Sequence, residues 1–279
     1  MSQNTIKILG VKITTENEYS ILEKIDKYFK NGKSRKAKGK SDGVKPLVIF
    51  TPNPEIVVFA EKNKTFRQTV NTGQINLPDG AGIVWAVEKK YKLKIRRISG
   101  VDFMLSLCRQ AVKRNDRIGL IGGRTGLAVQ TAECLRKLNQ GLKIDVLGEP
   151  EIKIRNSEFE ILNYNKGKVI NSEKYFENLI NAIEQRKIDV LFVALGFPKQ
   201  EYFIQKLKEK MQQSNWGKPL VMMAVGGSFD YLSGKAKRAP QWLRDRGLEW
   251  AYRLIREPSR WKRQLTGSVF FPQIYFRKH

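Results

Sequence analysis

Asp79 is the residue of this sequence whose type and position best suit it to move a proton. It follows the apolar stretch 74–77 and precedes Gly80, so it is expected in the turn that ends a strand. A single carboxylate at such a place can accept a proton from an attacking hydroxyl in a group transfer. A turn aspartate with no chemical role fits the position equally well.

Composition excludes several other kinds of catalytic and metal site. The only histidine is His279, which removes histidine zinc sites, Ser-His-Asp triads and Cys-His pairs. Cys108 and Cys134 lack CxxC spacing and are expected to be reduced core residues. No Asp-x-Asp pair occurs, so the carboxylate pair with which many group-transfer enzymes hold a cation is missing. We therefore expect no metal and no cofactor, and proton transfer by a carboxylate, Lys or Tyr.

Glycines and polar residues follow five of the predicted strands. Ligands of open α/β sheets bind at the carboxyl ends of strands, where glycine lets a phosphate approach the backbone. Each glycine is also an ordinary turn former, but their recurrence at one edge favours a diphosphate site. The glycines of this set are Gly122, Gly123, Gly196, Gly226 and Gly227.

Two familiar phosphate motifs do not fit the sequence. In GLIGGRTG, Gly122 and Gly123 are adjacent, which is the wrong register for the GxGxxG turn of nicotinamide enzymes. The stretch Gly39-Lys40-Ser41 is no P-loop, because Ser34 stands where the first glycine should be and no apolar strand precedes it. A nicotinamide oxidoreductase is therefore a weak alternative.

The elements that must position these residues follow from the hydrophobic pattern. Short β-rich apolar runs alternate with longer amphipathic stretches, as in a parallel sheet covered by helices. The sequence thus predicts an α/β fold with a Rossmann-like, mostly parallel sheet flanked by helices. The expected strands are 5–13, 46–51, 74–77, 117–122, 142–147, 188–195 and 219–225.

Helix ends are marked by capping residues. Thr15 with Glu18, and Ser99 with Asp102, have the spacing of a capping box. The pair 53–54, Asn followed by Pro, predicts an N-cap and the first residue of a helix. The first helix is expected to stop at Asn31-Gly32.

Three segments depart from the alternation of strands and helices. The lysine-rich stretch 33–43, with its surroundings to 45, is expected to be a solvated, mobile loop, and 148–171 to carry a small hairpin. From Ala239 the chain is dense in Arg and holds three of its five Trp. We therefore predict an α/β catalytic domain at 1–238 and a basic helical appendage at 239–279.

The formal charge of +25 indicates partners that bear phosphate, namely nucleic acid, anionic lipid or phosphorylated small molecules. A basic nucleic-acid-binding protein is the main alternative to an enzyme, although no recognition module is legible. No run approaches the ~20 apolar residues of a membrane span, and MSQNTIKILG lacks the features of a secretory signal. We expect a cytoplasmic protein that does not cross a bilayer.

Several sequence motifs of this chain together resemble those of a known protein family. They are TPNPEIVVFA at 51–60, LPDGAGIVWA at 77–86, RISGVD at 97–102, LGFPKQE at 195–201, and GGSFDYLSGKAKRAP with GLEWAYRLIREPSRWKR within 226–263. In this order the sequence resembles the WecG/TagA/CpsF family of bacterial glycosyltransferases over about residues 5–264. The resemblance covers nearly the whole chain.

This resemblance implies an inverting transfer of N-acetylmannosamine, or its uronic acid, from UDP to N-acetylglucosamine on undecaprenyl diphosphate. The β-linked product would serve wall teichoic acid, enterobacterial common antigen, capsule or exopolysaccharide, and the family needs no metal. Implied partners are the UDP-sugar donor, the polyprenyl-diphosphate-linked acceptor and the inner face of the cytoplasmic membrane. The resemblance is also compatible with a homo-oligomer. Nucleic acid is not expected as a partner.

The resemblance also implies roles for single residues. Asp79 matches the family's proposed base, and the pocket residues it implies are Thr51, Asn53, Arg97 and Gln200. The basic tail of the family engages the membrane and the acceptor diphosphate. In this chain those roles would belong to Arg253, Arg256, Arg260 and Arg263.

Overall fold

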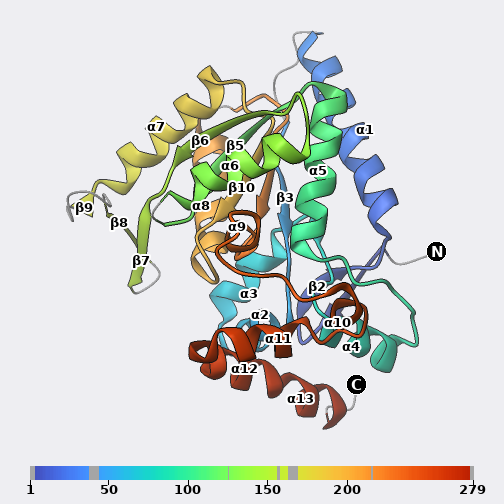
Figure 1. The fold of residues 1–279 in the computed structure, drawn as a ribbon. Helices are drawn as coiled ribbons and strands as arrows, with labels where there is room; N and C mark the ends of the chain where they lie inside the picture. Colours follow the sequence, from blue (N-terminus) through green and yellow to red (C-terminus); the bar gives the residue numbers. More distant parts are fainter. Residues whose placement is uncertain are drawn as a thin grey trace.

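The computed structural model describes residues 4–37, 44–124, 126–155, 158–162, 169–214 and 216–276. Its centre is a six-stranded sheet in the order β4-β3-β11-β10-β5-β6, in which every neighbouring pair is parallel (Figure 1). The predicted α/β class with a mostly parallel sheet is therefore confirmed. The strands are β3 (Leu47–Phe50), β4 (Ile75–Asn76), β5 (Arg117–Gly122), β6 (Lys143–Gly148), β10 (Val190–Ala194) and β11 (Val221–Ala224).

Helices cover both faces of this sheet, so its central strands are apolar along their whole length. All residues of β10 and β11 are buried. The helices before the C-terminal segment are α1 (Glu18–Ala37), α2 (Pro54–Lys62), α3 (Lys64–Asn71), α4 (Ala81–Tyr91), α5 (Gly100–Arg114), α6 (Leu127–Leu138), α7 (Ser172–Gln185), α8 (Lys199–Gln213) and α9 (Ser228–Leu232).

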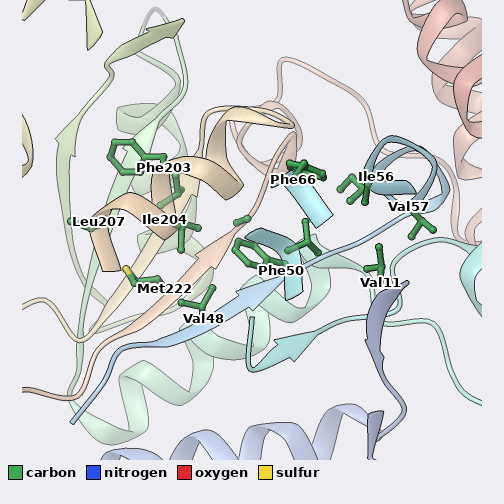
Figure 2. Packing of buried hydrophobic residues seen from close by; sticks show 14 of the residues in the cluster. Val11, Val48, Phe50, Ile56, Val57, Phe66, Phe203, Ile204, Leu207 and Met222 are labelled. Carbon is green, nitrogen blue, oxygen red and sulfur yellow. The ribbon is translucent and has the colours of Figure 1, made fainter. Parts of the chain in front are cut away.

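Alternate residues of each strand supply two separate cores. Val48, Phe50 and Met222 point to one face, where they pack with apolar residues of α2, α3 and α8 (Figure 2). Ile49 and Met223 point to the other face, which α1, α5 and α6 cover. Because successive side chains of a strand point to opposite faces of the sheet, the position of a residue in the strand determines against which layer of helices it packs.

The N-terminal segment is a hairpin, so the prediction of one strand over 5–13 was wrong. β1 (Thr5–Ile8) pairs antiparallel with β2 (Val11–Thr14), and Ile8 lies opposite Val11. The two turn residues have positive φ, 47° at Leu9 and 81° at Gly10, as a type I′ turn demands. The apolar residues continue across this tight turn, which hid it from the hydrophobic pattern.

Helix α1 passes through Gly32, where the sequence predicted its end. A Cβ at Gly32 would lie 2.9 Å from side-chain atoms of Pro219, so glycine is needed for a close contact and does not end the helix. The helix continues to Ala37, so the first residues of the expected lysine-rich loop are helical; residues 38–43 lie outside the described chain.

The predicted caps have three different outcomes. Asn53 is confirmed, because its Oδ1 accepts a hydrogen bond from the Ile56 N–H at 2.9 Å. At α1 the cap is Asn17 and not Thr15, since Asn17 Oδ1 accepts from the Ser20 N–H at 2.9 Å. Ser99 is the N-cap residue of α5 but makes no side-chain cap hydrogen bond.

The segment 148–171 holds the predicted hairpin and one strand more. β7 (Glu151–Arg155), β8 (Glu158–Leu162) and β9 (Val169–Ile170) form a small antiparallel sheet outside the central one. Its first strand begins at the carboxyl edge of the central sheet, where Glu151 and Ile152 line the cavity described below.

The C-terminal segment is helical and packs along one end of the molecule (Figure 1). It consists of α10 (Gln241–Asp245), α11 (Glu249–Arg256), the short 3-10 helix η1 (Pro258–Arg260), α12 (Trp261–Ser268) and α13 (Phe270–Phe276). α12 contacts α2, and α13 contacts both α2 and α4. Phe270 and Ile274 of α13 are buried in the core shared with α2. No helix in the described part of the chain is long and apolar enough to span a membrane.

Candidate active site

A cavity of about 790 Å³ lies at the carboxyl edge of the central sheet. The turns after β3, β4, β5, β10 and β11 all contribute to it, and α4, α11 and α13 close its other side. The structure therefore brings together the five strand ends that the sequence indicated. The predicted residues that line the cavity are Thr51, Asn53, Asp79, Arg97, Gly123, Gly196, Gln200, Gly226, Gly227 and Arg253.

Asp79 lies in the turn between β4 and α4 and faces this cavity. Its Oδ2 accepts a weak hydrogen bond from the Gly100 N–H at 3.4 Å. Burial raises the pKa of Asp79 to about 6, opposed by the Arg97 charge and the Gly100 N–H and assisted by Glu249 and Asp102. A carboxyl that titrates near neutrality is well matched to general base catalysis.

Ion pairs connect the surroundings of Asp79 to the C-terminal helices. Arg238 binds both carboxylate oxygens of Asp102, at 2.6 and 2.7 Å. Glu249 of α11 lies between two arginines, 3.4 Å from Arg97 Nη2 and 3.5 Å from Arg238 Nε. Partial burial opposes ionisation of Asp102, but the hydrogen bonds from Arg238 outweigh it and lower the pKa of Asp102.

Gln200 ties two of the turns together. It is 2% exposed, its Oε1 accepts from the Gly226 N–H at 2.9 Å, and its Nε2 donates to Glu201 Oε1 at 2.9 Å. The turn after β11 is thereby held against the start of α8. The Asn53 oxygen is likewise engaged in capping α2, so both predicted pocket residues also shape the pocket.

Four of the five predicted glycines line the cavity, and Gly122 does not. A Cβ at Gly122 would lie 2.4 Å from the carbonyl oxygen of Ala194, and its φ is 92°. The neighbouring strands β5 and β10 therefore require glycine here for their close approach.

The structure describes the side chains of two of the four predicted tail arginines, and their surroundings differ. Arg253 reaches the cavity, where its guanidinium lies 4.8 Å from the Tyr231 ring centre and its Nη2 lies 3.7 Å from Asp230 Oδ2. Arg256 is exposed, 5.6 Å from the ring centre of Tyr252, and does not line the cavity. The side chains of Arg260 and Arg263 are outside what the structure describes.

Several cavity residues were missed by the sequence reasoning. Lys199 and Glu249 lie inside the LGFPKQE and GLEWAYRL stretches, so a signal for them existed. Trp85 of α4 and Phe271 of α13 form an aromatic pair in the wall, with ring centres 5.2 Å apart. Phe271 belongs to a C-terminal stretch that carried no functional signal. Within the described ranges, no three His, Cys, Asp or Glu side chains converge as metal ligands would.

The model of the glycosyl transferase WecG/TagA/CpsF family matches residues 6–279. The chain belongs to this family. It is therefore a glycosyltransferase, as the resemblance implied, and nothing in the matches supports the nucleic-acid-binding alternative.

Two relatives of this glycosyltransferase are named N-acetylglucosaminyldiphosphoundecaprenol N-acetyl-beta-D-mannosaminyltransferase. The protein of Bacillus spizizenii is 32% identical over 225 residues, which are 81% of this chain and 77% of the relative. That of Bacillus subtilis is 33% identical over 220 residues, which are 78% of this chain and 75% of the relative.

Proposed function

We propose that this glycosyltransferase moves N-acetylmannosamine, or a related sugar, from UDP to undecaprenyl-diphosphate-linked N-acetylglucosamine, with inversion at the anomeric carbon. The observation that carries the proposal is Asp79, a carboxyl whose pKa is raised to about 6 within a cavity at the carboxyl edge of the sheet. The names of the two Bacillus relatives supply the sugar and the acceptor.

In this mechanism the Asp79 carboxylate accepts the proton of the acceptor hydroxyl. The hydroxyl oxygen forms a bond to C1 of the donor sugar from the face opposite the nucleotide. The bond between C1 and the phosphate oxygen breaks, and UDP leaves with the electron pair. One base is sufficient because the donor carries its own leaving group.

We further propose that side-chain cations, and no metal ion, stabilise the leaving diphosphate. The sequence has no Asp-x-Asp pair to hold a cation, while Arg97, Arg124, Lys199, Lys235 and Arg253 all line the cavity. Charge-assisted hydrogen bonds from arginine and lysine are well suited to phosphate oxygens. Turnover is therefore expected to survive a chelator.

Because the proposed acceptor is a lipid, we propose that the reaction takes place at the inner surface of the cytoplasmic membrane. Trp242, Trp250 and Trp261 of the C-terminal segment are 56%, 53% and 51% exposed, among many basic residues. Tryptophan favours the interface of a bilayer, and basic residues favour anionic headgroups. We propose that residues 239–279 hold the enzyme at this surface during synthesis of wall teichoic acid or another surface polysaccharide.

Product analysis tests this function. The protein is incubated with UDP-N-acetylmannosamine and a short-chain lipid diphosphate that carries N-acetylglucosamine, and the one-bond carbon–proton coupling at the new anomeric carbon is measured. A β-linked disaccharide is expected. An α-linked product would contradict inversion, and a product formed only from other UDP-sugars would contradict the assigned donor.

A further inference from the structure

Two cations of the cavity lie at the ends of neighbouring strands. Arg124 follows β5 and Lys199 follows β10, which are neighbouring parallel strands, and both side chains line the cavity. No described acidic side chain forms an ion pair with either of them, or with Lys235, which lines the cavity from the segment after α9. Arg124 and Lys199 differ from Lys235 in lying together at two adjacent strand ends. Partial burial, followed by the charge of Arg124, lowers the pKa of Lys199, and the charge of Glu151 opposes this shift. Two like charges held together in this way favour the binding of an anion.

The arginines on the other side of the cavity already have carboxylate partners. Arg97 is paired with Glu249, and Arg253 contacts Asp230 and Glu257. An anion that bound there would have to compete with these carboxylates. Glu151 acts on Lys199 through its charge but forms no ion pair with it, so an anion between Arg124 and Lys199 would displace no ion pair with a described carboxylate.

The glycine turn after β5 is followed by the N-terminus of α6. In dinucleotide-binding folds a phosphate binds at the corresponding helix N-terminus. Here that place is occupied by Glu149. Its Oε2 accepts a hydrogen bond from the Gly126 N–H and its Oε1 one from the Ala128 N–H, both at 2.9 Å. The backbone donors are therefore engaged, and the negative charge of Glu149 repels a phosphate.

We propose that the diphosphate of the nucleotide donor binds between Arg124 and Lys199, and that Glu149 keeps it away from the N-terminus of α6. Arginine can bind two phosphate oxygens at once, and lysine adds a point charge. The two cations would then meet the negative charge that develops as the nucleotide leaves. This assignment rests on the proposed function, since it names the binding site of that donor.

The position of the pair in the sheet fits such a donor. Asp79 follows β4, which is three strands away from β10 in the sheet order. At about 4.8 Å per strand this separation is about 14 Å for Lys199, and about 19 Å for Arg124, which follows the next strand, β5. The separation leaves room for a sugar and an acceptor hydroxyl between the cations and the base. The diphosphate and the base thus lie toward opposite ends of one cavity.

The test measures the affinity of the full-length protein for UDP and for uridine by calorimetry. In Lys199→Gln and Arg124→Gln, UDP should bind roughly tenfold more weakly, because each variant loses a charge-assisted hydrogen bond. Uridine, which has no phosphate, should bind as it does to the wild type. Lys206→Gln is the matched control, because Lys206 lies on the same helix as Lys199 but faces Glu173.

Glu149→Gln distinguishes the two possible phosphate-binding sites, which are the Arg124 and Lys199 pair and the N-terminus of α6. If the diphosphate bound at α6, loss of this charge would strengthen UDP binding by tenfold or more, whereas our assignment expects a far smaller change. Unchanged UDP affinity in both Lys199→Gln and Arg124→Gln would overturn the assignment. Wild-type protein that binds no UDP would instead contradict the proposed function itself. Thermal melting of each variant excludes loss of fold as the cause of weak binding.

Discussion

The carboxyl of Asp79 is held in a balance of opposing effects. Loss of water raises its pKa to about 6, and the nearby Arg97 prevents a larger rise. A carboxylate with a lower pKa would be a weaker base, and one with a higher pKa would be protonated at neutral pH. The sequence predicted the residue but not its pKa, because the groups around it come from α5, α11 and, through Arg97, the segment before α5.

The pH dependence of turnover follows from this value. A base acts only when it is deprotonated, so turnover should rise with pH through about 6 and level off above it. The measurement is kcat/KM for UDP release between pH 5 and 8 at constant ionic strength. A rate that is independent of pH over this range would argue against Asp79 as the base.

Gly122 should matter for stability and not through contact with a ligand. Gly122→Ala places a Cβ 2.4 Å from the Ala194 carbonyl oxygen, so the free energy of unfolding should fall by about 2 kcal/mol or more. Gly196→Ala is the control, since it also has positive φ but no atom within 4 Å, and should cost about 1 kcal/mol. Equal losses in urea denaturation would contradict the steric explanation.

At the scale of helices and strands, the sequence predicted those features that depend on neighbouring residues in the chain. The strands of the central sheet and the cap at Asn53 depend on nearby residues, and both were predicted. The end of α1 was not predicted correctly, because Gly32 is required by its close contact with Pro219, which lies nearly two hundred residues away in the sequence. The contact of Glu249 with Arg97 was missed for the same reason.

Helix α11 is expected to tune the base through Glu249. The charge of Glu249 favours protonation of Asp79, so Glu249→Gln should lower the pKa of Asp79 and move the acid limb of the pH profile to lower pH. Asp245→Asn is the control, because Asp245 bonds to Gln241 and does not line the cavity. If Glu249 had only a structural role, Glu249→Gln would reduce turnover at all pH values and would leave the acid limb of the pH profile at the same pH.

At the scale of the whole molecule, the net charge of +25 suits the phosphate-bearing substrates that we propose. The C-terminal helices bring both a cavity wall and exposed tryptophans to one end of the fold. The sequence indicated this segment by its composition. Its packing on α2 and α4 could not be read from the sequence, because buried Phe270 looks like its exposed neighbour Phe271.

Deletion of residues 239–279 should leave a folded α/β domain, since the six strands and the helices on both of their faces precede residue 239. The truncated protein would lack Glu249 and Arg253 and the exposed tryptophans, so we expect little turnover and weak binding to vesicles. Circular dichroism measures the folding of the truncated protein, co-sedimentation with vesicles of anionic lipid measures its membrane binding, and release of UDP measures its turnover. Full turnover by the truncated protein would refute this role for the segment.

The most direct test of the central claim is release of UDP from UDP-N-acetylmannosamine in the presence of EDTA and the lipid-linked acceptor. Wild-type protein should release UDP only when the acceptor is present, and Asp79→Asn should release almost none while still binding UDP. Equal release by both proteins would contradict the assignment of Asp79 as the base, and loss of release on addition of EDTA would contradict catalysis without a metal.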